Sequence, residues 1–473
     1  MTDRLQTAVS DIAAACSDYA LVPLLLAVAL YFTWLTRGVQ FTMIPEMLRL
    51  LVRSGRKVRG TGARGTGGVS SFQAFAVSIA SRVGTGNLAG VASAIAIGGP
   101  GAVFWMWVIA LLGAATAFAE STLAQLFKVR GAASFVGGPA YYIERGLRCR
   151  PWAVTFAVLI TLTFGFAFNT VQANTIAGAA GESFGIPAGA VAAALAVLTL
   201  AVICGGIRRI ARFSQWVVPV MAVAYLVLAL AVVILNIGRL PDVLCLIVEN
   251  AFGLREAAGG TLGAAMAMGI RRGLFSNEAG EGSTPCAAAT ADVSHPVKQG
   301  LIQALGVYTD TLVVCSCTAF IILCSGLSPA GGGDGIVLTQ RAIDAGLGAG
   351  GGAGSAFVAV AVFFFAFTSI VANYYYGETN LRFITRRRWV VPAYRAAVGA
   401  AVAAGALASL DLVWGLADIT MALMTLCNLA AIAALSPYVR ALLTDYRRQL
   451  PLGDPVYRAS SVPKIARITD VWK

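Results

Sequence analysis

Long apolar blocks follow one another along most of the chain, and short polar loops separate them. Each block has roughly 20 residues or more, the length that an α-helix needs to cross about 30 Å of hydrocarbon. The pattern predicts eleven membrane-spanning helices, near residues 19–37, 71–97, 100–127, 152–180, 187–204, 213–237, 257–280, 298–325, 354–380, 390–409 and 412–436. We therefore expect an all-α polytopic membrane protein.

The loops alternate between basic and non-basic. At almost every turn, a loop with several arginines or lysines alternates with one that is neutral, mixed, acidic or rich in glycine, and the loop with His295 and Lys298 is assigned by this alternation. Basic loops stay on the cytoplasmic side of a membrane, so the alternation supports the helix count and places the N-terminus outside and the C-terminus in the cytoplasm. The only histidine, His295, is then expected on the surface of a cytoplasmic loop. The glycine-rich stretch from Gly326 to Ser355 is expected to be a flexible external loop.

Composition agrees with a membrane protein and argues against several other classes. Of the 473 residues, 58% are hydrophobic and 12% are charged, whereas soluble domains are about a quarter charged. The net charge of +13 arises in short loops beside apolar segments, so we expect the lipid bilayer as a partner and no nucleic acid. The nine cysteines include no CxxC pair, which argues against a transition-metal site or a disulfide framework.

The second apolar segment is interrupted by the sequence SRVGTGNLAG at residues 81–90. Its glycines look like a dinucleotide-binding fingerprint, but three residues rather than two precede the last glycine, and no strand comes before it. Close helix packing would use Gly86 and Gly90, yet it does not explain Arg82 and Asn87. A buried arginine costs at least ~2.5 kcal/mol on insertion scales, so we favour a functional interpretation.

We expect this helix to be discontinuous. Gly84 and Gly86 weaken the helix, and unwinding there exposes carbonyl groups near Ala80 to Val83 and N–H groups near Gly86 and Asn87. Carbonyl oxygens suit a small cation, and N–H groups at a helix N-terminus suit a carboxylate. Irregular backbone at this depth is tolerated only where it lines a cavity, which makes the segment a candidate binding site.

A second interrupted helix is expected at residues 266–280, MAMGIRRGLFSNEAG, which again combines glycines with arginines. Inverted-repeat transporters carry such segments at matching positions of two halves. If each interrupted helix begins a group of five, the eleven helices divide into one extra helix and two groups of five. The expected division is residues 1–66 for the extra helix and a basic cytoplasmic linker, 67–240 for repeat one, 241–438 for repeat two and 439–473 for a cytoplasmic tail.

These segments resemble the alanine or glycine:cation symporter family, also called sodium:alanine symporters. The resemblance covers most of the chain and lies in SRVGTGNLAGVASAIAIGGPGAVFWMW (81–107), RGLFSNEAGEGSTP (272–285) and ANYYYGETNLRF (372–383). It implies a five-plus-five inverted-repeat fold like that of the sodium-coupled neurotransmitter transporters. It also implies cation-coupled import of small neutral amino acids such as alanine and glycine across an inner membrane. Glu281 departs from the family pattern, in which we expect an apolar residue.

The implied substrate is a small zwitterion, which needs donors for its carboxylate and acceptors for its ammonium group. Backbone amides of the first interruption would serve the carboxylate, while Gln172 and carbonyls of the second interruption would serve the ammonium group. Gln172 has a second interpretation, a hydrogen bond between helices. The candidate substrate residues are Thr85, Gly86, Asn87, Gln172, Met266 and Gly269.

The candidate cation site lies between the first interruption and the helix near 354–380. In the implied fold the latter helix supplies paired hydroxyl groups to a sodium site, and Thr368 and Ser369 are adjacent hydroxyl residues within it. Uncharged oxygen ligands favour Na⁺ over H⁺ as the coupling ion, and we expect no other cofactor. The candidate cation ligands are Ala80, Val83, Phe365, Thr368 and Ser369.

Four further residues are candidates for gating or for a buried ion pair, namely Arg82, Glu120, Asn277 and Glu278. We expect Arg82 to pair with Glu120 or Glu278, and Glu120 to be either such a partner or a proton carrier. Asp310 is a candidate partner for Arg271 or Arg272.

The sequence argues against functions other than transport. A membrane-embedded hydrolase needs a nucleophile and a base at matched depth, and His295 lies outside the apolar segments. A channel would line its pore with repeated charges or carbonyl loops, and the sequence shows no repeated filter. The nearest alternative keeps the fold but couples to H⁺ or carries another small solute. The preferred amino acid, the stoichiometry and the oligomeric state are left open.

Overall fold

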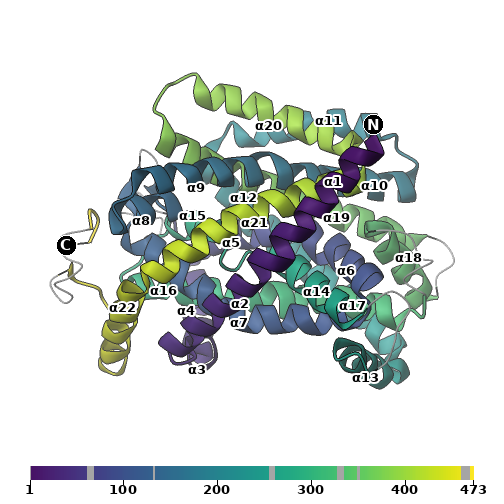
Figure 1. Ribbon diagram of the computed structural model, residues 1–473, viewed down its shortest axis with the longest axis horizontal. Coiled ribbons are helices and arrows are strands. Elements are labelled where there is room, and N and C mark those ends of the chain that lie inside the picture. Colours follow the sequence, from purple (N-terminus) through teal and green to yellow (C-terminus); the bar gives the residue numbers. More distant parts are fainter. Residues whose placement is uncertain are drawn as a thin grey trace.

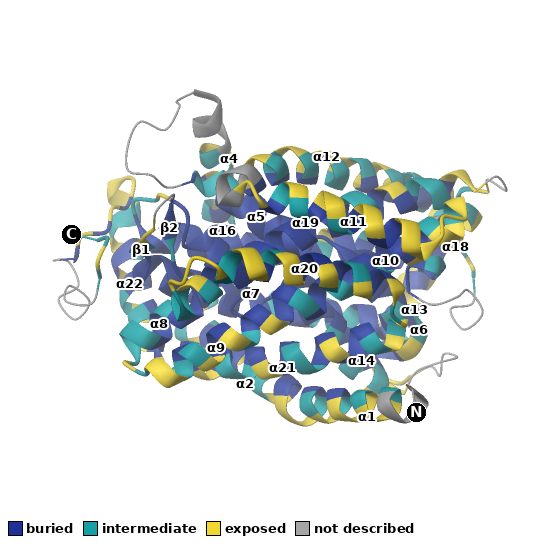
Figure 2. Ribbon diagram, turned by 90° about the horizontal axis from the view of Figure 1, so that it is seen from above, coloured by how far each residue is buried: buried dark blue, intermediate teal, exposed yellow. Residues whose placement is uncertain are grey.

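The computed structural model describes residues 2–60, 69–131, 134–254, 261–327, 335–348, 352–459 and 469–472. Long helices run side by side through the molecule, and the residues between them are buried while the outer faces are exposed (Figures 1 and 2). Within the described ranges, eight helical segments are long and apolar enough to cross a membrane. The shorter apolar helix α11 (Ala188–Ile203) and two broken helices supply the other three predicted crossings.

The first half of the chain forms α1 (Thr2–Ala15), η1 (Cys16–Leu21), α2 (Val22–Leu35), α3 (Val39–Thr42), α4 (Ile44–Gly60), α5 (Ser71–Arg82), η2 (Gly86–Gly90), α6 (Val91–Gly98), α7 (Gly101–Leu126), the antiparallel strands β1 (Val129–Arg130) and β2 (Phe135–Val136), α8 (Pro139–Gly146), α9 (Arg150–Leu162), η3 (Thr163–Ala167), α10 (Phe168–Phe184), α11 and α12 (Gly206–Leu235). The second half forms η4 (Ile237–Arg239), α13 (Leu240–Ala251), α14 (Leu262–Asn277), α15 (Thr284–Ala288), α16 (Pro296–Val307), η5 (Tyr308–Cys315), α17 (Ser316–Cys324), α18 (Ile336–Leu347), α19 (Ala353–Ile384), α20 (Val390–Leu407), α21 (Leu410–Ala434), α22 (Ser436–Gln449) and η7 (Leu450–Leu452). The segments η1, η2, η3 and η5 are π-helical stretches inside longer helices.

The N-terminal helix is longer than the predicted span 19–37, because it runs from Thr2 through η1 to Leu35. Its first part lies along α21, where Gln6 donates a hydrogen bond to Ser409 at 2.9 Å. This part is amphipathic, with polar and apolar residues mixed along the sequence. It therefore contains no continuous apolar block from which a spanning helix would be predicted.

The predicted glycine-rich external loop is only partly a loop. Residues 336–347 form the helix α18, which packs against α17 and α19. Residues 328–334 and 349–351 lie outside the described ranges, as do residues 61–68 of the predicted basic linker.

The first broken helix is where the sequence predicts it. Helix α5 begins at a capping box, in which Ser70 and Gln73 satisfy each other's backbone N–H groups. The chain leaves the helix at Val83, whose backbone is extended (φ −79°, ψ 91°), and resumes a helical path at Gly86. The prediction of a break at Gly84 is confirmed.

The second broken helix is interrupted after Asn277 rather than near Met266. Between α14 and α15, Glu278, Gly280 and Gly282 have φ angles of 54°, 89° and 86°. Glycine adopts this left-handed conformation without a steric penalty, whereas a residue with a Cβ atom rarely does. The two glycines therefore define the turn, and Glu278 takes a conformation that its surroundings must impose.

Arginine and lysine side chains gather at one end of the bundle, beside α8, α22 and the strand pair. We call this the basic end; it carries Arg130, Arg145, Arg150, Lys298, Arg382, Arg386 and Arg440. Helices α13 and α18 lie at the opposite end, together with the start of α1 (Figure 1). Because the chain starts at one end and finishes at the other, it crosses the bundle an odd number of times.

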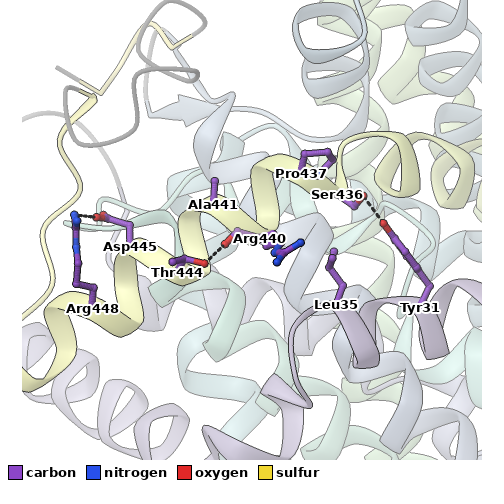
Figure 3. A pocket seen from close by; sticks show the side chains of 9 residues that line it. All are labelled: Tyr31, Leu35, Ser436, Pro437, Arg440, Ala441, Thr444, Asp445 and Arg448. Carbon is purple, nitrogen blue, oxygen red and sulfur yellow. Dashed lines mark hydrogen bonds and ion pairs between the residues drawn. The ribbon is translucent and has the colours of Figure 1, made fainter.

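The predicted tail packs against the basic end. Helix α22 contacts α16 and α7, and a cavity of about 510 Å³ lies between α22 and the end of α2 (Figure 3). Tyr31 Oη and Ser436 Oγ, 2.8 Å apart, bridge this cavity. Further along, Asp454 pairs with Lys298 at 2.6 Å, and Trp472 Nε1 donates to the carbonyl of Gln125 at 2.8 Å.

The prediction that His295 lies on the surface is wrong. The side chain is fully buried under α22, and its Nε2 atom lies 3.4 Å from the Asp445 carboxylate. Its Nδ1 atom accepts a hydrogen bond from the N–H of Val297 and so caps α16. The helix that buries His295 is α22, whose Asp445 lies 150 residues later in the chain. The position of His295 in a loop does not indicate this contact.

The burial of His295 predicts a loss of stability in acid. Burial lowers the pKa of His295 to about 4, although the neighbouring Asp445 carboxylate opposes the shift, and an ordinary histidine has a pKa of about 6.5. Between these values the unfolded chain binds a proton that the folded chain does not, so stability falls as the pH falls. We expect the melting temperature of the purified protein, followed by tryptophan fluorescence, to drop between about pH 6.5 and pH 4, with at most about 3 kcal/mol due to this group.

The matched variant is H295Q, whose amide does not titrate. The acid-dependent drop should be smaller in H295Q than in the wild type. An equal drop in the two proteins would assign the acid sensitivity to other groups.

Candidate functional site

The two helix breaks lie against each other in the buried centre of the bundle. At the first break η2 packs on α14, and a Cβ atom on Gly86 would lie 3.0 Å from the Cα atom of Ser276. Ser81 Oγ donates a hydrogen bond to the Glu278 carboxylate at 2.5 Å, which joins the last turn of α5 to the second break. Every residue from Ser81 to Val91 is buried. Protein therefore encloses both breaks in this conformation.

At the first break, side chains accept the amide protons that the helix no longer uses. The N–H of Gly84 donates to Asn87 Oδ1 at 2.9 Å, and the N–H of Thr85 donates to Gln172 Oε1 at 3.1 Å. A Cβ atom on Gly84 would collide with Ser369 Oγ and lie 3.0 Å from Gln172 Oε1. The Thr85 hydroxyl is buried and has no partner among the described residues. Three predicted substrate residues, Thr85, Gly86 and Gln172, thus meet at one place.

Four of the five predicted cation ligands also come together here. Ser369 Oγ lies 2.8 Å from the carbonyl oxygen of Ala80 and 3.0 Å from that of Phe365. Thr368 Oγ1 lies 2.8 Å from the same Phe365 carbonyl. The fifth, Val83, is the first residue beyond the helix. Two carbonyls and two hydroxyls form an uncharged oxygen set of the kind that coordinates Na⁺ at unwound helices, and the binding role stays a prediction.

A second polar cluster, centred on Asp310, lies on the other side of η2. Asn87 Nδ2 donates to Asp310 Oδ1 at 2.7 Å, and Ser276 Oγ donates to Asp310 Oδ2 at 2.7 Å. Thr311 Oγ1 completes the cluster at 3.0 Å from Oδ2. The side chain of Asn87 is therefore committed to Asp310 and to the break itself, so only its backbone N–H remains for a substrate. In the sequence, the only indication of this cluster is the presence of an aspartate, Asp310, inside an apolar segment.

The prediction that Asp310 pairs with Arg271 or Arg272 is wrong. Arg271 Nε donates to Asp18 of the N-terminal helix at 2.9 Å. Arg272 pairs with Asp418 of α21 at 2.5 Å, and both side chains are buried. Asp18 and Asp418 lie far from the two arginines in the sequence. The helical spacing of residues around the arginines therefore does not predict these partners.

The prediction that Arg82 forms an ion pair with Glu120 or Glu278 is also wrong. Its guanidinium donates to the carbonyl of Gln303 and to the hydroxyl of Thr284, each at 3.1 Å. Within the described part of the chain, no carboxylate lies within 4.0 Å of the guanidinium nitrogens. Arg82 therefore ties α5 to α16 and to the start of α15 through neutral acceptors.

Glu120 holds the second break in place instead of pairing with Arg82. Its carboxylate accepts hydrogen bonds from the N–H groups of Gly280 and Gly282, at 3.2 and 3.0 Å. Asn428 Nδ2 donates a third at 2.9 Å. A carboxylate from α7 thus satisfies two backbone donors that the break exposes, which explains a glutamate in this apolar helix.

Asn277 and Glu278 shape the start of the same break. Asn277 Oδ1 accepts the N–H of Ala279 at 3.0 Å, two residues further on. Glu278 accepts from Ser81 and from Ser283, each at 2.5 Å, so it joins the two broken helices. Both residues shape the second break, and their role in gating stays a prediction.

Met266 and Gly269 do not lie at the second break. Both belong to the continuous helix α14, and a Cβ atom on Gly269 would lie 2.7 Å from Trp105 Cβ of α7. Gly269 therefore allows two helices to pack closely and does not interrupt one of them. The carbonyls that the break leaves free belong to the last turn of α14, which ends at Asn277.

Aromatic rings fill the space beside the first break. The Phe275 ring lies with its centroid 4.4 Å from that of Phe168 and 4.7 Å from that of Trp414. Its Cδ1 atom is 3.1 Å from the position of a Cβ atom on Gly86. The first break therefore brings amide, hydroxyl and carbonyl groups together beside closely packed aromatic rings.

Known proteins share both the sequence and the fold. Residues 2–459 match the model of the sodium:alanine symporter family. The amino-acid carrier protein AlsT of Bacillus subtilis (strain 168) is 50% identical over 451 residues, which cover 95% of this chain and 94% of the relative. The sodium/proton-dependent alanine carrier protein of Bacillus sp. (strain PS3) is 39% identical over 413 residues, which cover 83% of this chain and 92% of the relative.

Among solved structures, MhsT in complex with L-phenylalanine superposes with a TM-score of 0.52 and 15% identity, over 86% of this chain and 94% of that chain. The expected five-plus-five inverted-repeat fold, similar to that of the neurotransmitter-sodium symporters, is confirmed. So is the expectation of a transporter rather than an enzyme. With a family model that spans nearly the whole chain and relatives that match it from end to end, the chain belongs to the sodium:alanine symporter family.

Proposed function

We propose that the protein imports alanine, glycine or another small neutral amino acid together with Na⁺, by alternating access. The observation that carries this proposal is the meeting of two broken helices at one buried place, where groups of Thr85, Gln172 and Ser369 converge. Discontinuous helices let a secondary transporter hold a charged solute and its ion near the bilayer midplane. Relatives that are named amino-acid carrier and alanine carrier support an amino acid as the solute.

The substrate carboxylate would lie against the start of the helical run Gly86–Gly98, whose N–H groups and dipole favour a negative charge. The unpartnered hydroxyl of Thr85 would add a donor. Gln172 and the last turn of α14 would accept from the ammonium group. Phe275 packs closely beside Gly86 and would limit the size of the substrate side chain.

The coupling ion would take the oxygens of Ala80, Phe365, Thr368 and Ser369, with Val83 as a further carbonyl ligand. No charged group contacts these four oxygens in the described residues, which suits Na⁺. The Bacillus PS3 relative is named for both sodium and protons, so coupling to H⁺ through one of the buried acids is the second candidate.

The basic end would face the cytoplasm of the cell, with the start of α1 outside, because basic loops remain on the side of synthesis. The protein would lie in the inner membrane. Residues 67–240 and 241–438 would form the two inverted repeats, each headed by one of the broken helices.

The direct test is transport by the purified protein in proteoliposomes. Radiolabelled alanine or glycine should accumulate under an inward Na⁺ gradient, and dissipating that gradient should stop accumulation. The same measurement under an inward H⁺ gradient distinguishes the two coupling ions. A protein that takes up neither these two nor any other small neutral amino acid under either gradient would refute the proposal.

Removal of the two hydroxyls should weaken the cation site. In the double variant T368V/S369A we expect the Na⁺ concentration for half-maximal uptake to rise by about tenfold or more, which corresponds to about 1.4 kcal/mol of lost binding energy. The control is T420V, which removes an exposed hydroxyl that bonds only within its own helix. Unchanged Na⁺ dependence in the double variant would place the cation elsewhere.

Gly84 should not tolerate a methyl group. In G84A the new Cβ atom would collide with Ser369 Oγ and press on Gln172, so we expect uptake to fall by roughly a hundredfold, as a misplacement of about 1 Å does in other precise sites. The control is G189A in α11, where a Cβ atom would meet nothing within 4 Å. Normal uptake by a well-folded G84A protein would show that the first break does not hold the substrate.

A further inference from the structure

In the part of the chain that the structure describes, nothing bonds to the carboxyl group of Glu281. It lies in the turn between α14 and α15, flanked by Gly280 and Gly282, and its side chain has no exposed surface. Neither of its oxygen atoms has a hydrogen-bond partner among the described residues. The two other glutamates of this region differ sharply, because Glu120 accepts three hydrogen bonds and Glu278 accepts two.

The charges that face Glu281 do not stabilise a third negative charge. Glu278 on the same turn and Glu120 on α7 both repel an ionised Glu281, and only Arg82 on α5 attracts it. Tyr142 of α8, Cys286 of α15 and Tyr376 of α19 also face this group of carboxyl side chains, and none of them brings a positive charge. A single guanidinium thus faces three carboxyl groups, and it already donates to neutral acceptors.

An ionised carboxylate in such a place is not tenable. The effective penalty of burying one ion in a protein is several kcal/mol even after relaxation, and Glu281 receives no hydrogen bond that would offset it. A buried acid in this situation takes up a proton instead. A bound metal ion is a poorer solution, because Arg82 occupies the same neighbourhood and the oxygens of Glu120 and Glu278 are already satisfied.

We propose that Glu281 is a proton-binding site that is linked to opening of the basic end. With that end closed, the carboxyl group is neutral. When α15 moves away and water enters, the O–H bond breaks, the proton passes to cytoplasmic water, and a hydrated carboxylate remains. Closing reverses the step and takes up one proton. This inference rests on the alternating-access function proposed above, which requires that the basic end open.

The sign of the pH dependence follows from this difference in proton binding. The closed conformation binds one proton more than the open conformation, so alkaline pH favours opening and acid favours closure. An ordinary glutamic acid in water is ionised above about pH 4.3. Between about pH 5.5 and pH 7.5 the population of the open conformation should therefore rise, by up to about tenfold per pH unit.

Cys286 offers a native reporter of this opening. It lies in α15, five residues beyond Glu281, and is fully buried in the closed conformation. In a protein whose other cysteines are replaced by alanine, we would measure the rate at which a small maleimide labels Cys286, without amino acid or Na⁺. A protein that retains only the exposed Cys204 corrects for the intrinsic pH dependence of thiol labelling.

The matched variant is E281Q, which keeps the shape of the neutral acid but cannot release a proton. The corrected labelling rate of Cys286 should rise by at least about tenfold between about pH 5.5 and pH 7.5 with Glu281 present, and it should stay within about twofold in E281Q. Parallel pH profiles in the two proteins would overturn the proposal.

A second measurement detects the proton directly. Infrared spectra of the closed protein near neutral pH should contain the C=O band of a protonated carboxyl group, and that band should be missing in E281Q. If the two spectra agree in this region, Glu281 is not protonated and the proposal fails. Neither measurement uses transport, so a failure of this inference can be told apart from a failure of amino-acid uptake, which would refute the proposed function.

Discussion

The structure depends on one constraint, namely that a backbone N–H or C=O group in the hydrocarbon region must find a partner inside the protein. A helix meets this requirement by itself, and a broken helix does not. At both breaks, polar side chains accept the amide protons that unwinding exposes. The pairs are Gly84 with Asn87, Thr85 with Gln172, Ala279 with Asn277, and Gly280 and Gly282 with Glu120. Four buried polar side chains, those of Asn87, Gln172, Asn277 and Glu120, therefore serve the breaks directly.

The same side chains also connect the two candidate sites. Gly84 lies between Ser369, a candidate cation ligand, and Gln172, a candidate substrate residue, with no room for a Cβ atom. Ser369, on α19, in turn donates a hydrogen bond to the carbonyl of Ala80 in the last turn of α5, just before the break. A shift of a few tenths of an ångström at either ligand must move the other, since packed interiors do not absorb such shifts elsewhere. In the function that we propose, this contact would couple the binding of the ion to that of the amino acid.

The sequence allowed the crossings and the first break to be predicted because their signals are local. A block of apolar residues predicts a spanning helix wherever it packs, and adjacent hydroxyls such as Thr368 and Ser369 lie on known turns of that helix. The second break was misplaced because a glycine has two uses. Gly269 lets α14 approach α7, whereas Gly280 and Gly282 turn the chain at positive φ, and only the tertiary structure tells these uses apart. Partners distant in sequence, such as Asp418 for Arg272, were missed for the same reason.

The buried charges around the breaks limit how the transporter can work. Five acids, Glu120, Glu278, Glu281, Asp310 and Asp418, share this interior with two arginines, Arg82 and Arg272. If all seven were ionised, five negative charges against two positive ones would leave three in excess, at a cost of several kcal/mol each. Protons or bound cations must supply most of that difference in a closed conformation. Enclosure of these acids therefore favours the uptake of positive charge on closing and its release on opening, which supports the cation coupling that we propose.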